Sequence, residues 1–294
     1  MKVILKVINR LHGSRLQQVV ICSALFCLLD SCSSSSAKRF DTESTDGLQV
    51  ITWNIANFGA SKSDAEIQFV ASIVKSHEVL AIQEVSTGPA GAQAVARLDD
   101  ELDRTGAKWD YVVSDATTGD GSERYAVLWK TSNVTKVGTP VLCNALANTV
   151  NREPFLVRLA EGKDTFLLAV FHAVPKSKNP NGENVQLSRV DSLYEKDHVL
   201  LMGDFNASSR TAGFNWLKRR NMSGILVNQK TSLKQKPDEN GNTLANEYDN
   251  IFYELDETKC VEYGIHNFAS AFATLADARK VSDHIPIWGT FKVK

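Results

Sequence analysis

The chain has 294 residues, of which 43% are hydrophobic and 23% charged, a composition typical of a globular protein and unlike that of a disordered one. Lysine and arginine number 33 against 34 aspartates and glutamates, so the net charge of −1 excludes a strongly basic protein that binds polyanions through its overall charge. Once an N-terminal targeting segment is set aside, about 260 residues remain, enough for one large domain, and no linker-like stretch divides them.

The first residues have the pattern of a secretory signal peptide. Four basic residues precede an uncharged apolar run from Val19 to Leu29, which is too short to span a bilayer and has the length of a signal-peptide core. The sequence Leu29-Asp30-Ser31-Cys32 then resembles a bacterial lipobox, in which the cysteine is acylated and becomes the mature N-terminus. Asp30 departs from the small or apolar residue usual there. Ordinary cleavage with release and an uncleaved anchor are the alternatives.

These features predict the organisation and the location of the chain. We expect residues 1–31 to be a lipoprotein-type signal peptide cleaved before Cys32, residues 32–47 a Ser-rich flexible tether, and residues 48–294 the folded domain. Cleavage leaves 29 basic and 33 acidic residues, a charge of −4, so affinity for a polyanion must come from a local patch or from bound cations. We expect a monomer in the bacterial cell envelope, touching the membrane only through its lipid anchor and facing the periplasm or the exterior, or else a secreted protein.

The folded part begins with alternating strand and helix patterns. The expected elements are a strand at 48–53, a helix capped by Asp64 and running to Ser76, a strand at 79–83 and a helix at 90–104. From residue 111 onward, short runs rich in β-branched and aromatic residues predict antiparallel strands instead. These runs are 111–114, 125–129, 155–159, 166–171, 199–202, 250–253 and 285–291. The polar stretch from Pro175 to Asn184 is expected to be a loop. This order of elements favours an α+β fold of two packed sheets with helices outside.

Polar and ionisable side chains stand where these strands begin or end. They are Asn54, Glu84, His172, Asp204, Asn206, Asp249, Asp283 and His284. Any one of them has an ordinary structural interpretation, such as a turn residue or a hydrogen-bonded core histidine. Together they are expected to meet at one edge of the sheets and to form a site.

The residue types at these strand ends indicate the chemistry of such a site. Carboxylates and amide oxygens, with no cysteine among them, suit a hard cation such as Mg²⁺, Mn²⁺ or Ca²⁺ rather than zinc. Two histidines that titrate near neutral pH can move protons at an attacking water and at a leaving oxygen. A metal combined with acid–base histidines fits metal-assisted hydrolysis of a phosphodiester.

Two cysteines, Cys143 and Cys260, lie beyond the N-terminal segment. They are expected either to form one disulfide in an oxidising compartment or to remain two separate buried thiols. Their spacing does not decide between these alternatives.

The ordered motifs resemble the endonuclease/exonuclease/phosphatase superfamily and, within it, the DNase I-like branch. The superfamily set is TWNIANFG at Asn54, IQEV at Glu84, LMGDFNA at Asp204 and Asn206, EYDNIF at Asp249 and SDHIPI at Asp283 and His284. Three further stretches resemble DNase I in particular: ERYAVLW at Glu123, NREPFLVRL at Arg152 and FHAVP at His172. The resemblance covers nearly all of residues 48–294. It implies a four-layer α/β sandwich of two packed, mainly antiparallel sheets flanked by helices.

The resemblance also implies where a metal would bind. Glu84 would hold Mg²⁺ or Mn²⁺, supported by Asn54 and Asp283, and Ca²⁺ is the option for a structural ion. Asp204 and Asn206 would bind the phosphate or a second cation.

The remaining roles that the resemblance implies concern proton transfer and the phosphate. His172, oriented by Glu123, and His284, oriented by Asp249, would form the acid–base pair. Arg152 would bind a phosphate oxygen, which a guanidinium fork does well. The alternative for Arg152 is a surface ion pair with Glu153.

Two departures bear on the substrate. DNase I-like enzymes place an arginine just past the metal-binding glutamate and a tyrosine near Glu123 to contact the grooves of duplex DNA, whereas this chain has Ser86 and Gly121. Other basic residues would have to supply such contacts, or else are simply solvated: Lys218, Arg219, Arg220, Lys230, Lys234 and Lys236.

The sequence therefore predicts an endodeoxyribonuclease of low sequence specificity that acts on DNA and leaves 5′-phosphate ends. The main alternative is a secreted phosphodiesterase or phosphatase that acts on lipid or inositol phosphate headgroups, like a sphingomyelinase. An abasic-site repair endonuclease and a catalytically inactive binding protein are further alternatives. The first is disfavoured by export and the second by the complete site.

Overall fold

The computed structural model describes residues 47–294. The predicted signal peptide (1–31), the predicted lipidation site Cys32 and the predicted tether up to residue 46 lie outside the described residues, so these predictions stay untested. Within residues 47–294, no helix is both long enough and apolar enough to cross a membrane.

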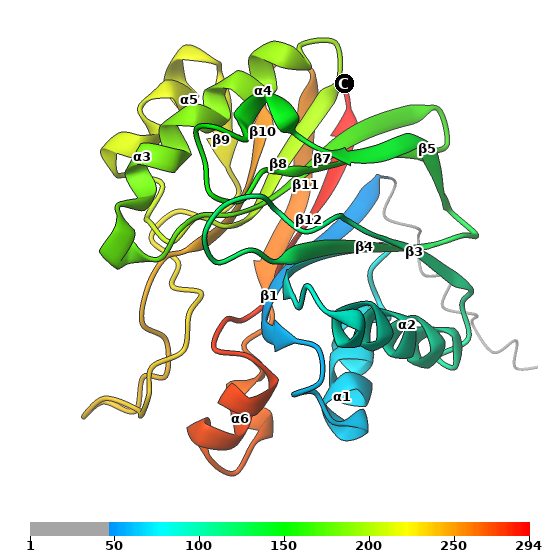
Figure 1. Ribbon diagram of the computed structural model, residues 1–294, viewed down its shortest axis with the longest axis vertical. Coiled ribbons are helices and arrows are strands. Elements are labelled where there is room, and N and C mark those ends of the chain that lie inside the picture. The colour runs from blue at the N-terminus through cyan, green and yellow to red at the C-terminus, as the bar shows by residue number, and fades with distance from the viewer. Residues whose placement is uncertain (1–46) are drawn as a thin grey trace, which may run out of the picture. The chain divides into compact units, whose positions relative to one another are not determined.

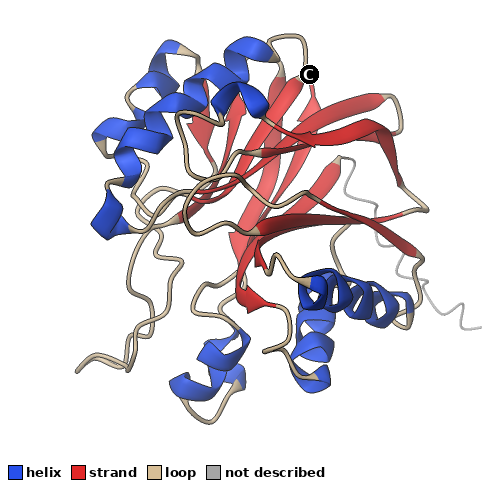
Figure 2. Ribbon diagram, in the orientation of Figure 1, coloured by secondary structure: helices blue, strands red, loops and turns tan. Residues whose placement is uncertain are grey.

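Twelve strands of residues 47–294 form two six-stranded sheets that pack face to face (Figure 2). The strands of the first sheet are β1 (Leu48–Phe58), β2 (Val79–Val85), β3 (Trp109–Val113), β4 (Arg124–Lys130), β11 (Thr258–Ile265) and β12 (Ile287–Val293). Those of the second sheet are β5 (Val134–Leu142), β6 (Phe155–Glu161), β7 (Asp164–His172), β8 (His198–Asp204), β9 (Met222–Gly224) and β10 (Asp249–Glu254). Their orders are β11-β12-β1-β2-β4-β3 and β5-β6-β7-β8-β10-β9.

Helices cover the outer face of each sheet (Figure 1). Those over the first sheet are α1 (Asp64–Val74), α2 (Pro89–Asp103) and α6 (Leu275–Val281), and those over the second are α3 (Pro180–Asn184), α4 (Ser188–Leu193) and α5 (Trp216–Arg219). The result is helix, sheet, sheet, helix. The predicted four-layer α/β sandwich is therefore confirmed.

Alternation along the strands builds the three apolar layers between these elements. In β1, Ile51 and Trp53 pack toward α1 and α2, while Val50 faces the second sheet. In β7, Leu168 faces the first sheet and Phe171 packs toward the helices on the other side. Because both faces of the central strands are covered, these strands read as continuous apolar runs rather than as alternating ones.

Each sheet has one parallel strand pair, and it lies at the centre. These pairs are β1 with β2 and β7 with β8, and all other neighbours pair antiparallel. The two strands of a parallel pair end at the same edge of their sheet. The ends of the two pairs meet, since Asn54 Nδ2 of β1 donates a hydrogen bond of 3.0 Å to Asp204 Oδ2 of β8. This edge carries the site.

Several expected elements need correction. The first helix is capped by Ser63 rather than by Asp64, because Ser63 and Glu66 form a reciprocal capping box, and the helix ends at Val74. The stretch 175–184 is not a plain loop, since it holds a 3₁₀ turn (Lys176–Lys178) and α3. Strands β5 and β11 were not predicted because they are edge strands, whose largely exposed residues show no clear apolar alternation.

The two cysteines are free thiols in the structure. Cys143 is buried beside the helices of the second sheet, and Cys260 is half-buried in β11 of the first sheet. The structure therefore favours the second of the two alternatives, separate thiols.

Candidate active site

A bulge at the end of β2 turns Glu84 out of the sheet. The pairing of β2 with both neighbours shifts register around this residue, and Glu84 has a positive φ of 63°. A non-glycine residue in this conformation is strained, and such strain is concentrated at functional sites. The bulge brings the Glu84 carboxylate into the cavity, where Oε1 accepts from Asn54 Nδ2 at 3.1 Å and Oε2 from the backbone N–H of Asn57 at 2.9 Å.

The end of β8 is similarly adapted around Asp204. Gly203 has φ of +134°, and a Cβ there would lie 2.0 Å from the carbonyl oxygen of Phe171, so only glycine allows β8 to approach β7 this closely. Asp204 Oδ1 accepts from the backbone N–H of Asn206 at 2.8 Å. Asn206 in turn donates through Nδ2 to the carbonyl of Ala173 at 3.0 Å, which ties the ends of β7 and β8 together.

His172 ends β7 and is held by a buried carboxylate. Its Nδ1 lies 2.9 Å from Oε2 and 3.0 Å from Oε1 of Glu123, as the sequence predicted. Arg152 donates through Nη1 to Glu123 Oε2 at 2.7 Å and through Nη2 to the carbonyl of Ala173 at 2.8 Å. The alternative partner for Arg152, Glu153, is wrong, because Glu153 is buried and accepts from Thr118 instead.

Arg152 lines the cavity, where the sequence predicted a phosphate ligand. Its buried Nε has no hydrogen-bond partner in the described part of the chain, whereas both of its terminal nitrogens donate to protein oxygens. The phosphate role stays a prediction, and the structure adds a second role, which is to neutralise Glu123.

His284 is held by a different arrangement. Its Nδ1 lies 2.8 Å from Asp249 Oδ2, the partner that the sequence predicted. That same carboxylate oxygen accepts from the hydroxyl of Thr231 at 2.6 Å, so a second donor, which is neutral, fixes the position of Asp249. Trp53 Nε1 donates to the carbonyl of His284 at 2.8 Å and anchors the backbone to β1.

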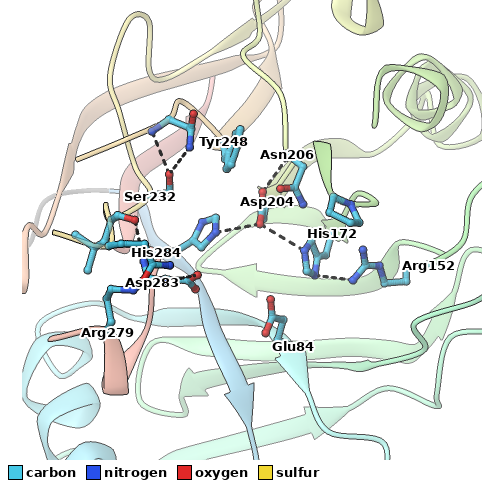
Figure 3. Close-up of a pocket in the computed structure, with 14 residues that line it drawn as sticks. Glu84, Arg152, His172, Asp204, Asn206, Ser232, Tyr248, Arg279, Asp283 and His284 are labelled. Atoms are coloured by element: carbon cyan, nitrogen blue, oxygen red, sulfur yellow. Dashed lines mark hydrogen bonds and ion pairs between the residues drawn. The ribbon is translucent and has the colours of Figure 1, made fainter. Parts of the chain in front are cut away.

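Asp204 stands between the two histidines (Figure 3). Its Oδ2 lies 3.4 Å from His172 Nε2 and 3.4 Å from His284 Nε2. Each imidazole therefore has its Nδ1 against one carboxylate and its Nε2 toward the shared aspartate. A carboxylate can only accept, so Glu123 and Asp249 favour a proton on each Nδ1, while the Nε2 atoms face Asp204 and the cavity.

The charges of these groups support one another. Burial disfavours charge on both rings, but Asp249 and Asp204 raise the pKa of His284 to about 10, and Glu123 and Asp204 raise the pKa of His172. Burial also opposes charge on Asp204, yet the two histidines hold its pKa below the usual range. The pKa of Asp249 is raised by burial. The site is thus a chain of alternating acids and bases in a buried setting.

The donor set fits a divalent cation beside Glu84. The Asn54 side chain donates through Nδ2 to Glu84 and to Asp204, and its buried Oδ1 has no hydrogen-bond partner among residues 47–294. A buried, unpartnered amide oxygen next to a carboxylate is a place where a hard cation would supply the missing interaction. Asp204, Asp249 and His284 also offer ligand atoms within 4.8 Å of one another, but these atoms already contact each other. We therefore favour Glu84 and Asn54 as the primary ligands.

Asp283, the third predicted metal ligand, also lines the cavity. It is paired with Arg279 of α6 at 3.2 Å, so part of its charge is already balanced. Its place as a ligand stays a prediction.

The cavity has a volume of about 420 Å³. The predicted residues that line it are Glu84, Arg152, His172, Asp204, Asn206, Asp283 and His284. Three further predicted residues lie behind this lining and contact it: Asn54 contacts Glu84, Glu123 contacts His172 and Asp249 contacts His284. It also contains residues that sequence reasoning did not assign to the site: Pro175, Ser232, Leu233, Gln235, Asn246, Tyr248 and Arg279.

Most of the unassigned residues belong to residues 225–248, which we call the arm. The arm connects β9 to β10 and projects from the sheets (Figure 1). It is anchored at the site by a bridge between Ser232 and His284 and by the backbone N–H of Leu233, which donates to the carbonyl of Asp283 at 2.7 Å. Its polar sequence has no periodicity, so its only signal was Tyr248, directly before Asp249.

The basic residues considered for nucleic-acid contacts lie in two places. Lys218, Arg219 and Arg220 are at α5, outside the cavity, and Arg220 pairs with Asp191 at 3.1 Å. The others, including Lys230 and Lys234, are on the arm, although Lys234 pairs with Asp238 at 2.5 Å. Of these six basic residues, only those on the arm belong to a segment that also lines the cavity.

The chain belongs to the endonuclease/exonuclease/phosphatase family, whose model matches residues 51–284. A protein of Thioalkalivibrio sp. (strain K90mix) named deoxyribonuclease is 30% identical over 267 residues, which are 83% of this chain and 71% of that protein. Enzymes of this family usually use divalent metals, as the donor set here suggests.

Solved structures support the same fold. TDP2 of D. rerio complexed with a single-strand DNA product has a TM-score of 0.59 and 15% identity, covering 84% of this chain and 99% of that one. The mannosyl-6-phosphatase of Bacteroides thetaiotaomicron has a TM-score of 0.58 and 14% identity, covering 83% of this chain and 99% of that one. Because these two proteins differ in substrate, their likeness establishes the DNase I-like fold and leaves the substrate of this chain open.

Proposed function

We propose that this hydrolase is a divalent-metal-dependent endodeoxyribonuclease of low sequence specificity that leaves 5′-phosphate ends. The observation that carries the proposal is the placement of Asp204 Oδ2 at 3.4 Å from the Nε2 atoms of both His172 and His284. Two proton-transfer groups that converge on one point from opposite sides suit an in-line displacement, in which one oxygen attacks as another leaves.

Different residues of the chain transfer protons, orient the histidines and bind the phosphate. His284, whose pKa is raised to about 10, is charged at neutral pH and delivers a proton to the departing 3′ oxygen, while Nε2 of His172 accepts the proton of the attacking water. Glu123 and Asp249 hold the two rings in the tautomer that this exchange requires. Asn206 and Arg152, which both line the cavity, would contact the phosphate. A divalent cation held by Glu84 and Asn54, Mg²⁺ or Mn²⁺, would polarise a phosphoryl oxygen and offset its developing charge.

Two observations support DNA over a lipid headgroup. The curated relative is named a deoxyribonuclease. In addition, of the fourteen residues that line the cavity, only Pro175 and Leu233 are apolar, so the site offers little surface for acyl chains or for a membrane. We keep the lipid or inositol phosphate phosphodiesterase as the alternative that the first experiment must exclude.

That experiment compares substrates directly. The full chain, purified in detergent, is incubated with supercoiled plasmid and with sphingomyelin vesicles, in Mg²⁺, in Mn²⁺ and in EDTA. We expect plasmid nicking with either metal, no nicking in EDTA, 5′-phosphate ends by end labelling, and no choline phosphate release.

Single variants connect the activity to the site. His172→Ala and His284→Ala should each lower nicking about 10²- to 10⁴-fold, as expected for loss of a general acid or base. His198→Gln removes a histidine outside the cavity and should leave nicking unchanged. Lipid turnover without nicking, or full nicking by both active-site variants, would overturn the proposal.

We further propose that a lipid on Cys32 holds the enzyme in the bacterial cell envelope. The lipobox-like sequence supports this location. Growth with radiolabelled palmitate should label the wild-type chain and leave Cys32→Ser unlabelled and released. An unlabelled wild-type chain found free in the medium would instead support ordinary secretion.

A further inference from the structure

A second cavity of about 460 Å³ adjoins the first. It lies between the loop after β7, which carries the 3₁₀ turn and α3, and the base of the arm. The two cavities share three lining residues: Asn206, Asn246 and Tyr248. Its volume falls within the range of small-ligand sites, about 300–1,000 Å³. A molecule that occupies both cavities would pass directly over Asn206, beside the catalytic histidines.

Charge in this second cavity is unbalanced in favour of an anion. Its one carboxylate, Glu247, is already paired with Arg210 at 2.9 Å and accepts from Ser208 at 2.8 Å. Lys176 and Lys230 also line the cavity, are exposed, and make no ion pair with any residue of 47–294. Two uncompensated ammonium groups, one on each side of a cavity next to a phosphodiesterase site, suit a phosphate.

An aromatic ring separates the two cavities. Tyr248 is half-buried and lines both cavities. Its ring, which Figure 3 shows among the residues of the first cavity, lies nearly parallel to that of His284 at an interplanar angle of 27°. Within residues 47–294 its hydroxyl has no hydrogen-bond partner, and its ring contact is with His284. Pro180, Ala207 and Ala245 add apolar surface to the second cavity. A flat ring with apolar neighbours is the surface on which nucleobases stack.

We propose that this second cavity binds the nucleotide next to the scissile phosphate in an unpaired DNA strand. Its base packs against Tyr248, and its far phosphate lies between Lys176 and Lys230. The inference rests on the proposed nuclease function and specifies its substrate. A base that enters a cavity against an aromatic ring has left its partner, so the enzyme should cut single strands in preference to duplex.

The experiment uses three substrates with the full chain in Mg²⁺: a single-stranded oligonucleotide, the same sequence as a hairpin duplex, and bis(p-nitrophenyl) phosphate. We expect the wild type to cut the single strand at least about tenfold faster than the duplex. For the Lys176→Ala/Lys230→Ala double variant, we expect KM for the single strand to rise about tenfold and the salt dependence of binding to weaken by about 0.7 per lost phosphate contact. Tyr248→Ala should raise the same KM about five- to hundredfold, while Tyr248→Phe retains the wild-type value.

The small ester separates this inference from the proposed function. It has no neighbouring nucleotide, so the losses of the lysine and tyrosine variants on the oligonucleotide should exceed their losses on the ester at least about tenfold. Lys218→Ala, an exposed lysine on α5 outside both cavities, should match the wild type on every substrate. Equal cutting of duplex and single strand, or an unchanged KM in the lysine double variant, overturns the subsite while leaving the nuclease intact. An enzyme that hydrolyses the ester but no DNA overturns the proposed function itself.

Discussion

Two pairs of histidines lie in buried parts of this protein, and the surroundings of one pair favour the charged ring while those of the other favour the neutral ring. His172 and His284, at the candidate active site, are 5% and 7% exposed, and the pKa of each is raised. His77 and His266 face each other with 2.9 Å between their Nε2 atoms, against Trp288. Burial, together with the neighbouring His266 and Lys130, lowers the pKa of His77 to about 3, and burial also lowers that of His266.

The difference comes from the counter-ions and not from burial. Burial lowers the pKa of an imidazole, and a nearby carboxylate raises it again. The catalytic rings each have one carboxylate at Nδ1 and share Asp204 at Nε2. The only hydrogen-bond partner of the His77 ring within residues 47–294 is the ring of His266. Three carboxylates therefore favour the charged form of His172 and His284, and changing these carboxylates tests the comparison.

The largest effect is expected for Asp204→Asn, because this carboxylate faces both catalytic histidines. Its loss should lower kcat for plasmid nicking about a thousandfold, because both histidines lose the carboxylate that they share. It should also lower the pKa of both His172 and His284, which can be followed by NMR titration of the imidazoles in EDTA.

The matched control is Asp197→Asn, which breaks an ion pair of 2.7 Å with Arg158 outside the catalytic cavity. It should leave both the rate and the two titrations unchanged. If Asp204→Asn kept the wild-type rate, the idea of one aspartate serving both histidines would have to be abandoned.

A smaller loss is expected for Arg152→Met. This change leaves Glu123 without its cationic partner, and breaking a buried ion pair is costly. Since Arg152 opposes the charge on His172, the pKa of His172 should rise further in the variant. We expect kcat for nicking to fall about a hundredfold, while Arg158→Met, its matched control, changes nothing.

Kinetics distinguish the two roles of Arg152. If the residue acts only as a phosphate ligand, KM will rise with kcat unchanged and the titration of His172 will not move. A fall in kcat together with a shifted titration supports the role in balancing Glu123.

The central part of the fold could be predicted from the sequence because its signals are local. The buried strands β1, β2, β7 and β8 are continuous apolar runs, and each is followed by polar residues. Motif order then placed Asn54, Glu84, His172 and Asp204 at one edge. The edge strands β5 and β11 were not predicted, because their largely exposed residues do not form a clear apolar pattern.

Contacts that depend on tertiary structure could not be read in this way. Arg152 precedes β6 of the second sheet and pairs with Glu123, which precedes β4 of the first sheet, rather than with its neighbour Glu153. Such a contact between the two sheets depends on how they pack. The arm supplies Ser232 and Tyr248 to the site although its sequence has no periodicity. Such residues can be assigned to the site only when the positions of the neighbouring strand ends are known.

The smallest effect concerns the other histidine pair and appears in stability rather than in rate. The pKa of His77 is about 3 in the folded protein and 6.5 as its ordinary value, so the unfolded chain binds the proton first. Stability from the neutral ring is therefore fully present above pH 6.5 and is lost as the pH falls from there toward 3. Between pH 7.5 and 5.0 this linkage amounts to about 2 kcal/mol of unfolding free energy.

His77→Gln keeps a donor for His266 but does not titrate, so urea unfolding should show wild type losing about 2 kcal/mol more than the variant over this range. Equal losses in both proteins would mean that His77 is already charged in the fold, and that burial without a carboxylate does not keep a histidine neutral here.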